Sequence, residues 1–356
     1  MTSPSRHAHV VGLGLIGASV ARALAEHNWT VTGDDVDPLV AEAALAAGVV
    51  VEGSINGATS FVVVATPAST VAGVASDVLK NWDRADLIVT DVAGVKTSIV
   101  NAVDDSRFLG GHPMAGSEQR GLAGARPDLF VGCTWVLTPT AATQPQTYSA
   151  VHGILREIGA NVVAVSASDH DRLVALASHV PHLLAGALMN EAARAAEEDA
   201  VLLQLAAGGF RDMTRVAAGD PSIWPDVLFE NRAAVTQTLK SLEDRLRSLR
   251  HALDDGQRPV IEQSLRDASH ARRQLPGRAL SADNLAYLRV NITDRPGELG
   301  AVTTAASELL VNIYDIEIAH DIEGLGGTLL LAVDTHMAEG FRDVLRGRGF
   351  TVAIER

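Results

Sequence analysis

The sequence predicts an α/β protein of three parts: an N-terminal doubly wound parallel sheet, an all-helical second domain and a C-terminal βαββαβ domain. Three features of the 356 residues predict this division. Apolar, β-branched runs alternate with helical patterns in the first half, strand-like runs stop near Ala167, and they resume after a polar stretch that begins at Pro276. Such alternation is typical of parallel strands covered by helices. We expect domains at 1–166, 167–280 and 285–356.

The first domain is predicted from short runs rich in Val, Ile and Leu, which suit strands buried on both faces. The runs expected as strands are His9–Val11, Thr30–Gly33, Phe61–Ala65, Leu87–Asp91, Trp135–Leu137 and Asn161–Val165, and helices are expected at Ala18–Glu26 and Pro38–Ala47.

The second domain is predicted from long patterns in which apolar residues recur every three to four positions. Helices are expected at Leu173–Ala195, Ala200–Leu205, Ile223–Asp254 and Val260–Gln274. One stripe, Leu228, Val235, Leu239, Leu242 and Leu246, predicts the core face of a helix. Because long helices with two apolar faces can also pack against a second copy of the chain, we expect a homodimer.

The third domain begins where alternating runs resume. Strands are expected at Leu288–Ile292, Ile313–Ala319, Thr328–Asp334 and Thr351–Ile354, and helices at Gly300–Leu310 and Gly340–Arg346. The resulting order, βαββαβ, is that of a ferredoxin-like unit.

Composition excludes several classes of protein. The formal net charge of −14 argues against a nucleic-acid partner, which needs a surplus of Lys and Arg on one face. The single cysteine, Cys133, excludes an internal disulfide framework and a cysteine-based zinc site. Since no apolar run approaches the length of a membrane span and the N-terminus lacks a signal-peptide pattern, we expect no membrane partner and a cytoplasmic location.

The first strand–turn–helix carries a dinucleotide-binding pattern of the Rossmann type. The segment Gly12, Leu13, Gly14, Leu15, Ile16 and Gly17 has the G-x-G-x-x-G spacing, follows a strand and opens a helix. Gly12 permits the tight turn, Gly14 lets the backbone approach a pyrophosphate, and Gly17 allows the helix to pack closely on the strand. The alternative is a glycine-rich turn with no ligand beside a solvated acidic loop.

The second strand ends in acids about 20 residues after the glycines, where a carboxylate binds the ribose 2′-hydroxyl in this pattern. Asp35 is our choice for that contact, with Asp34 as the alternative. Asp37 follows and no Arg accompanies these acids, so NAD is favoured over NADP. Thr66 and Pro67, directly after the expected strand Phe61–Ala65, are assigned to the same cofactor site.

A second motif, Gly110 to Glu118, reads GGHPMAGSE. His112 lies downstream of the strand that ends at Asp91, and open α/β sheets bind ligands beyond the carboxyl ends of their strands. A histidine there can take or give a proton near neutral pH. Most loop histidines are structural, but this one lies between glycine and proline in a loop at the expected site. Glu118 is expected to orient it or to close over the cofactor.

Together with the glycine turn, this segment resembles the prephenate dehydrogenase family of tyrosine biosynthesis. Three further segments agree: DVAGVK from Asp91 resembles the family's D-V-x-S-V-K loop, SHVPH from Ser178 its S-H-x-P-H segment, and GFRDMTR from Gly209 its G-F-R-D-x-T-R segment. The resemblance covers about the first three quarters of the chain. It implies oxidative decarboxylation of prephenate with NAD.

The resemblance also implies roles for individual residues. His112 is then the base or hydrogen-bond acceptor for the substrate's ring hydroxyl. Arg215 is the better candidate to grip a carboxylate, while Arg211, which shares a helix face with it at a spacing of four, either joins it or pairs with a nearby acid. His182 is expected to contact the substrate side chain and His179 to support it, and Ser117 and Glu118 complete the expected substrate contacts. The two histidines also have a metal-ligand spacing, but no third ligand is near in sequence, so no metal is expected.

One position departs from the family pattern. The family's D-V-x-S-V-K loop often carries a serine that hydrogen-bonds the catalytic histidine, and Gly94 stands there in this chain. Either a backbone group, Ser117, Thr97 or water therefore orients His112, or the loop is aligned differently.

The C-terminal unit resembles the ACT regulatory domain, through the segment DRPGEL from Asp294 and through Asn312 and Ile313. The resemblance implies a site for a small amino acid at Asp294, Pro296 and Gly297, facing Asn312 and Ile313, and so an aromatic amino-acid effector, tyrosine first. The alternative is an appended domain that only dimerises.

Two other functions remain open. Arogenate dehydrogenase is the close rival, because its substrate only replaces the keto group with an amine, and the sequence shows no carboxylate clearly placed to meet that amine. Hydroxy-acid oxidoreductases with a catalytic Lys are disfavoured, since Ala175–Asn190 contains none. A non-catalytic sensor of NAD and an amino acid is a different class, against which His112 and the two arginines argue.

Overall fold

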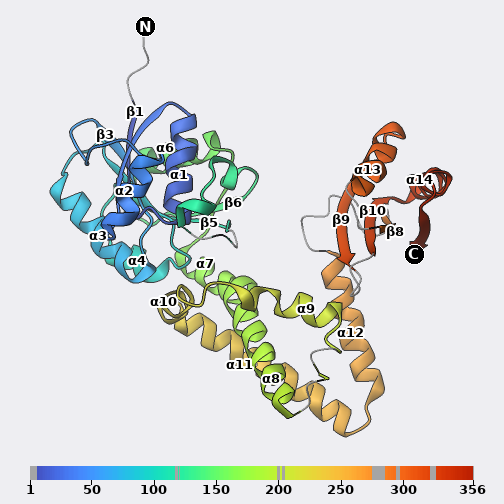
Figure 1. Cartoon of the computed structure of the whole chain (residues 1–356). Coiled ribbons are helices and arrows are strands. Elements are labelled where there is room, and N and C mark those ends of the chain that lie inside the picture. The colour runs from blue at the N-terminus through green and yellow to red at the C-terminus, as the bar shows by residue number, and fades with distance from the viewer. Residues whose placement is uncertain are drawn as a thin grey trace. The chain divides into compact units, whose positions relative to one another are not determined.

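The structure is a computed structural model, shown in Figure 1, and it describes residues 6–116, 119, 121–198, 201–202, 205–274, 285–293, 297–320 and 326–355. The chain forms two compact units, Met1–Glu243 and Asp244–Arg356. The domain boundary expected near residue 166 falls inside the first unit, between strand β7 (Asn161–Ala164) and helix α7 (Ala167–Val174).

The first unit contains a seven-stranded sheet in the order β2-β1-β3-β4-β5-β6-β7. Because β2 and β3 lie on opposite sides of β1, the direction of winding changes at β1 and β3, which is the doubly wound topology predicted from the sequence. The other six strands are β1 (Arg6–Val11), β2 (Trp29–Asp34), β3 (Thr59–Val64), β4 (Ile88–Asp91), β5 (Phe108–Pro113) and β6 (Thr134–Thr138).

The expectation of a wholly parallel sheet is wrong at β6, which runs antiparallel to β5, whereas the other neighbours pair in parallel. A parallel connection needs a crossover of a dozen or more residues, usually a helix. Between β5 and β6, the described residues form only α5 (Gly121–Gly124) and a 3₁₀ turn at Pro127–Phe130. The chain therefore turns back after β5, and β6 pairs with it in the opposite direction.

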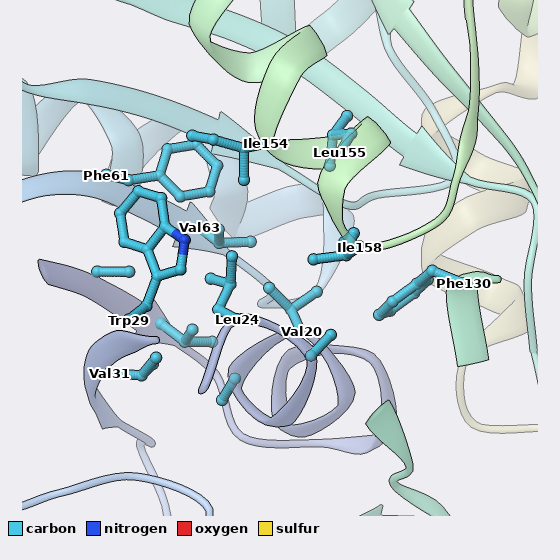
Figure 2. Close-up of a cluster of buried hydrophobic side chains, with 14 of the residues drawn as sticks. Val20, Leu24, Trp29, Val31, Phe61, Val63, Phe130, Ile154, Leu155 and Ile158 are labelled. Atoms are coloured by element: carbon cyan, nitrogen blue, oxygen red, sulfur yellow. The ribbon is translucent and has the colours of Figure 1, made fainter. Parts of the chain in front are cut away.

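Helices cover both faces of the sheet, as the alternation of side chains on β3 shows. Phe61 and Val63 point into one core and Val62 and Val64 into the other, so every residue of this run is buried. Figure 2 shows the first core, where Val20 and Leu24 of α1 meet Phe61, Val63 and, from α6, Ile154. The helices of this region are α1 (Leu15–Glu26), α2 (Pro38–Ala46), α3 (Ala68–Asn81), α4 (Thr97–Ala102) and α6 (Pro145–Glu157).

The helical part of the first unit begins with α7, which runs through a π-helical turn, Ala175–His179, into α8 (Val180–Glu198). Pro181 explains the turn: proline has no N–H to donate and its ring crowds the preceding carbonyls, so the helix widens before it. Such turns occur often at functional sites.

The remaining helices differ from expectation in two places. The pattern Ile223–Asp254 forms two helices, α10 (Trp224–Glu230) and α11 (Arg232–Asp254), separated at Asn231. Of the expected helix Ala200–Leu205, the structure describes Val201, Leu202 and Leu205, which form a turn and a bend. The segment predicted to carry the arginines forms α9 (Gly208–Thr214) and a 3₁₀ turn, Arg215–Ala218.

One stretch of the described residues, Ala167–Glu197, has the length and the mean hydropathy, 1.3, of a membrane-spanning helix. The expectation that no segment approaches such a span is therefore wrong by length and composition. The same stretch carries Asp171 and His179, both buried against other side chains of the first unit. Other side chains of this stretch, such as Leu173 and Leu176, are exposed, so length and composition alone do not establish a membrane span.

The second unit contains α12 (Arg258–Arg273) and a four-stranded sheet in the order β11-β8-β10-β9, with every pairing antiparallel. This arrangement confirms the predicted ferredoxin-like βαββαβ topology. Alternate residues of β8, Ala286, Leu288 and Val290, share a core with Val302 and Phe341 of the two helices. The elements are β8 (Leu285–Thr293), α13 (Glu298–Glu308), β9 (Ile313–His320), β10 (Gly326–Asp334), α14 (Thr335–Gly347) and β11 (Thr351–Glu355).

Candidate functional site

The glycine turn has the geometry that the spacing predicts. Gly12 has φ +92°, and a Cβ there would lie 2.6 Å from the carbonyl oxygen of Ala65. A Cβ on Gly17 would overlap the carbonyl of Gly12, which shows how closely the start of α1 packs on the turn. A Cβ on Gly14 would meet no described atom within 4 Å. The space beside Gly14 is therefore open to a ligand at the positive end of α1, as a pyrophosphate requires.

The structure separates the two acids that were alternatives for the ribose contact. Asp34 accepts a hydrogen bond from Nε2 of His9, at 3.0 Å, so its carboxylate turns toward β1. Asp35 accepts from the backbone N–H of Leu13 at 2.8 Å, so its carboxylate lies against the glycine turn itself. This position favours Asp35 for a ribose hydroxyl, and both carboxylates disfavour a 2′-phosphate there.

Thr66 and Pro67 lie across the switch point, where β3 gives way to α3. Pro67 precedes the first residue of α3, and the Thr66 hydroxyl accepts a hydrogen bond from that of Thr70 at 3.0 Å. Asp226 of α10 accepts the N–H of Ser69 at 3.2 Å, which joins the helical part to the start of α3. The glycine turn and the Thr66–Pro67 turn thus flank the switch point, and these residues fit a dinucleotide such as NAD.

The sequence predicted a loop at His112, but His112 is the fifth residue of strand β5. Its strand is fixed from behind by a buried ion pair between Lys96 and Asp91. Lys96 also donates to the carbonyl of Gly111 at 2.7 Å, and Asp91 accepts the N–H of Gly111 at 3.0 Å. Burial lowers the pKa of Lys96, and the adjacent Asp91 opposes that shift. The residue before His112 is therefore held on both of its backbone groups.

His112 is oriented by His170, a residue that no sequence motif singled out. Its Nδ1 lies 2.8 Å from Nε2 of His170, and Nδ1 of His170 lies 2.8 Å from Oδ1 of Asp171. Thr97, one of the candidates for this role, instead donates its backbone N–H to Asp171. Ser117, another candidate, lies outside the described residues, as does Glu118.

The opposite nitrogen of His112 faces Gly94. A Cβ on Gly94 would lie 3.7 Å from Nε2 of His112 and 3.9 Å from a methyl group of Val227 in α10. Burial, followed by the neighbours His170, Lys96 and His179, holds the pKa of His112 well below its usual range, and Asp171 acts in the other direction. His112 is therefore neutral at pH 7 and can accept a proton or a hydrogen bond.

A cleft of about 770 Å³ opens between the sheet and the helices of the first unit. It is lined by Leu15 of the glycine turn, Gly116 of the His112 motif, Ser178, Pro181 and His182 of the helix start, and Arg215, Asp220 and Trp224 of the segment after α9. His182 stacks on Trp224 with 3.6 Å between ring centroids. Burial lowers the pKa of His182. The cleft therefore combines apolar walls with a few polar groups, as ligand sites do.

The two arginines are not equivalent. Arg215 lines the cleft, whereas Arg211 lies exposed on α9 and is not among the described lining residues. The expectation that they share one helical face is wrong, because α9 ends at Thr214 and Arg215 opens a 3₁₀ turn. Arg215 is thus the one of these two arginines that faces the cleft.

His179 is buried beneath the cleft, and it contacts Trp224 edge-on at 6.3 Å between centroids. Asn231 lies 3.2 Å from Nδ1 of His179 and also donates to the carbonyl of Asp171 at 2.8 Å. Burial lowers the pKa of His179 to about 4. This histidine supports the cleft wall from behind. Among the described residues, no group of three His, Cys, Asp or Glu side chains is arranged to hold a metal ion.

In the second unit, two predicted regulatory residues, Asp294 and Pro296, lie outside the described residues. Gly297 has φ +102° and precedes α13, so its backbone takes the left-handed conformation that favours glycine. Asn312 directly precedes β9 and Ile313 is its first residue, so the strand begins where the pattern predicts.

Local motifs did not point to four residues of this site. Trp224 and Asp220 lie after the GFRDMTR segment, and His170 and Asp171 lie before the SHVPH segment, in the polar stretch SDHDR. A histidine followed directly by an acid at the start of a helix was the only available signal for the last pair.

Comparisons with known proteins agree on one family. Residues 20–164 match the family model described as the nucleotide-binding domain of prephenate dehydrogenase, and residues 166–267 match its dimerization domain. A prephenate dehydrogenase of Bacillus subtilis is 30% identical over 332 residues, 89% of this chain and 90% of that protein.

Two solved structures are similar over about three quarters of the chain. The prephenate dehydrogenase of Aquifex aeolicus, in complex with hydroxyphenyl propionate and NAD+, is 27% identical with a TM-score of 0.71, over 76% of this chain and 99% of that one. The arogenate dehydrogenase of Synechocystis is 31% identical with a TM-score of 0.65, over 75% and 98%.

Proposed function

Because the chain belongs to the prephenate dehydrogenase family, we propose that it catalyses the NAD-dependent oxidative decarboxylation of prephenate to 4-hydroxyphenylpyruvate. One observation carries the proposal: a neutral histidine, His112, lies near the carboxyl end of β5, at the same edge of the sheet as the glycine turn. One of its nitrogens is hydrogen-bonded and the other faces Gly94. Carboxyl ends of parallel strands share that edge.

Bound NAD would supply the hydride acceptor for the carbon that bears the ring hydroxyl. His112 Nε2 takes the hydroxyl proton as the hydride leaves, so no protonated carbonyl accumulates. As carbon dioxide departs, the electron pair of the broken carbon–carbon bond flows through the ring onto that oxygen, and His112 returns the proton. His112 thus ends the reaction in its starting protonation state, and the product is the neutral phenol. The protein contributes to catalysis by orienting the substrate and by supplying a base with a suitable pKa.

The cleft provides the substrate contacts of this proposal. Arg215 offers a guanidinium to a carboxylate of the substrate, which an acidic protein must capture with a local cation. Trp224 and His182 form a flat wall suited to a six-membered ring.

The test is an absorbance assay of NADH formation with purified protein, NAD and prephenate. Turnover is expected for the wild type. His112→Asn is expected to abolish turnover while NAD still binds in calorimetry. Wild-type protein that binds NAD but turns over neither prephenate nor arogenate would instead indicate a sensor of the cofactor, and full activity of His112→Asn would remove His112 from its role.

Arogenate is a second candidate substrate, and Asp220 favours it. This carboxylate lines the cleft with Arg215 and is fixed by hydrogen bonds from Ser222, at 2.9 Å from the backbone and 2.7 Å from the hydroxyl. A cation and a carboxylate in one cleft match the carboxylate and ammonium of an amino-acid side chain. The sequence did not place a carboxylate there.

Asp220→Asn keeps an acceptor for Ser222 and removes the charge. If the wild type oxidises arogenate, kcat/KM for arogenate should fall about tenfold or more, since hydrogen bonds to charged groups contribute about 1.5–3 kcal/mol, and kcat/KM for prephenate should change little. Equal losses for both substrates would contradict a contact with the amine.

We also propose that the chain forms a homodimer through its helical part. The matching family model is described as a dimerization domain, and described apolar side chains of this part, Leu173, Leu176, Leu188 and Phe229, are exposed in the single chain. A second copy of the chain would bury such side chains, and large exposed apolar surface favours a partner. Light scattering on the purified protein is expected to give twice the chain mass of 37.3 kDa. A monomer at micromolar concentration would contradict the proposal.

Finally, we propose that the second unit is an ACT-type domain that binds an aromatic amino acid. Its strand order and the left-handed Gly297 before α13 support this, since backbone N–H groups at a helix start can bind a carboxylate. Titration calorimetry with tyrosine and with phenylalanine tests it. Heat of binding and inhibition are expected with tyrosine, and the absence of heat with both ligands, on active protein, would refute it.

A further inference from the structure

When His170 is neutral, the hydrogen bonds behind His112 have only one consistent direction. Asp171 accepts the backbone N–H groups of Lys96 and Thr97, both at 2.8 Å, so its oxygens act as acceptors. Burial raises the pKa of Asp171, but the bonds from His170 and Thr97 outweigh this and hold the pKa below its usual range. An ionised carboxylate cannot donate, so Nδ1 of His170 carries the proton of their shared bond.

The remaining protons follow from that first one. In a neutral imidazole only one nitrogen carries hydrogen, so Nε2 of His170 is an acceptor. Nδ1 of His112, at 2.8 Å from it, must then be the donor, and Nε2 of His112 is left with a lone pair. The chain Asp171–His170–His112 therefore sets the tautomer in which the nitrogen facing Gly94 is the base.

We propose that His170 is a positioning residue for this proton transfer: it fixes the reactive tautomer of His112 and accepts the Nδ1 proton of His112 while Nε2 holds the proton of the substrate hydroxyl. This inference rests on the proposed dehydrogenase function. The proton count is unchanged at each step, since His112 becomes neutral again when its Nδ1 proton passes to Nε2 of His170, and the positive charge then lies next to Asp171. Both shifts reverse when the substrate oxygen regains its proton.

The charged and titratable groups around His112 explain why the positive charge moves from His112 to His170. Burial disfavours a positive charge on His112 most, His170, Lys96 and His179 disfavour it further, and Asp171 acts in the other direction. A charge on His170 lies 2.8 Å from the carboxylate of Asp171 and forms an ion pair there. His179 lies outside this chain of bonds, because its Nδ1 is taken by Asn231.

A purely structural role for His170 is the alternative. Asp171 already anchors α7 to the start of α4 through two backbone N–H groups, and Asn231 holds its carbonyl. His170 is buried, contacts His112 and bonds to Asp171, but it makes neither of these backbone contacts. Its role can therefore be tested separately from folding.

The first test is ¹⁵N NMR of the histidine rings in the ligand-free protein, which does not depend on turnover. The wild type is expected to show His112 protonated on Nδ1, assigned by comparison with His112→Asn. His170→Leu should lose this preference, and His170→Gln, whose amide can donate to Asp171 and accept from His112, should keep it. His152→Gln, a matched change away from the site, should have no effect. A wild-type His112 protonated on Nε2, or an unchanged tautomer in His170→Leu, would overturn the proposal.

The second test separates kcat from KM. For His170→Leu, kcat should fall about 100-fold with KM for both ligands nearly unchanged, a size typical of lost general acid–base catalysis. His170→Gln keeps the tautomer but cannot hold the proton, so its kcat should lie between those of His170→Leu and the wild type. Wild-type kcat in both variants, or a rise in KM alone, would overturn the proposal. If the wild type has no dehydrogenase activity, the proposed function fails, and the NMR result still decides the tautomer.

Discussion

Trp224 and His182 stack with an interplanar angle of 16° and 3.6 Å between ring centroids. Trp224 starts α10 and His182 lies in the first turn of α8, so the stack joins two helices that are 42 positions apart in sequence. The same α10 contacts the start of α3 through Asp226 and approaches Gly94 through Val227. One short helix thus links the cleft wall, the cofactor turn and the surroundings of His112.

We predict that Trp224→Leu weakens substrate binding more than cofactor binding. The variant removes the stack of Trp224 on His182, and an aromatic pair contributes about 0.5–1.5 kcal/mol beyond its buried area. If the cleft wall loses that much order, KM for the substrate should rise roughly two- to twelvefold. Steady-state kinetics with NAD and prephenate would measure it. Trp224→Phe preserves a stacking ring and should recover most of the loss, and an equal effect of both variants would argue against stacking.

The cofactor turn offers a matched pair of variants. Asp35→Asn should raise KM for NAD by roughly tenfold or more, because a charged acceptor for a ribose hydroxyl contributes about 1.5–3 kcal/mol. Asp34→Asn removes the same charge from a carboxylate that His9 holds, so KM for NAD should change little. A larger effect at Asp34 than at Asp35 would reverse the assignment.

Features of the fold and of the site could be predicted from the sequence where the residues that determine them lie close together in the chain. The glycine turn, Asp35 and the C-terminal topology follow from local spacing, and all were predictable. His170 lies 58 positions after His112 and meets it only because α7 packs on the strand end. The break at Asn231 has the same kind of origin: its side chain bonds to Asp171 and His179, a tertiary contact that a continuous apolar stripe conceals. Strand β6 runs antiparallel to β5 because the described part of the connection between them contains no helix long enough to cross the sheet.

Activity should depend on pH through His112. Because its pKa lies well below the usual value near 6.5, the base is unprotonated throughout the neutral range, and kcat/KM should remain flat as pH falls through 6.5. Activity should decline only in more acidic solution, where the lowered pKa is reached. A kcat/KM profile from pH 5 to 8 measures this, and a half-maximal point at or above about 6.5 would contradict the burial of the base.

Stability should depend on pH through His179. Its pKa is about 4 in the folded chain, below the unfolded value of about 6.5, so between these values the unfolded state binds more protons. Stability is therefore lost as pH falls from about 6.5 toward 4, by up to about 3 kcal/mol. His179→Asn keeps an acceptor for Asn231 but does not titrate. Urea unfolding at pH 7 and 4.5 should show a smaller pH effect in the variant, and an identical effect would exclude His179 as its source.

The buried pair under His112 should dominate the stability of the sheet. Lys96→Met leaves Asp91 as an uncompensated buried charge, which costs about 3–5 kcal/mol. Arg194→Met breaks the exposed pair with Glu191 and should change stability much less, because exposed ion pairs are screened by water. Tryptophan fluorescence during urea unfolding would measure both, because Trp29, Trp82, Trp135 and Trp224 all lie in the first unit. Adding Asp91→Asn to Lys96→Met removes the stranded charge, so the double variant should be more stable than Lys96→Met alone. If it is less stable, the backbone N–H groups that Asp91 accepts matter more than its charge.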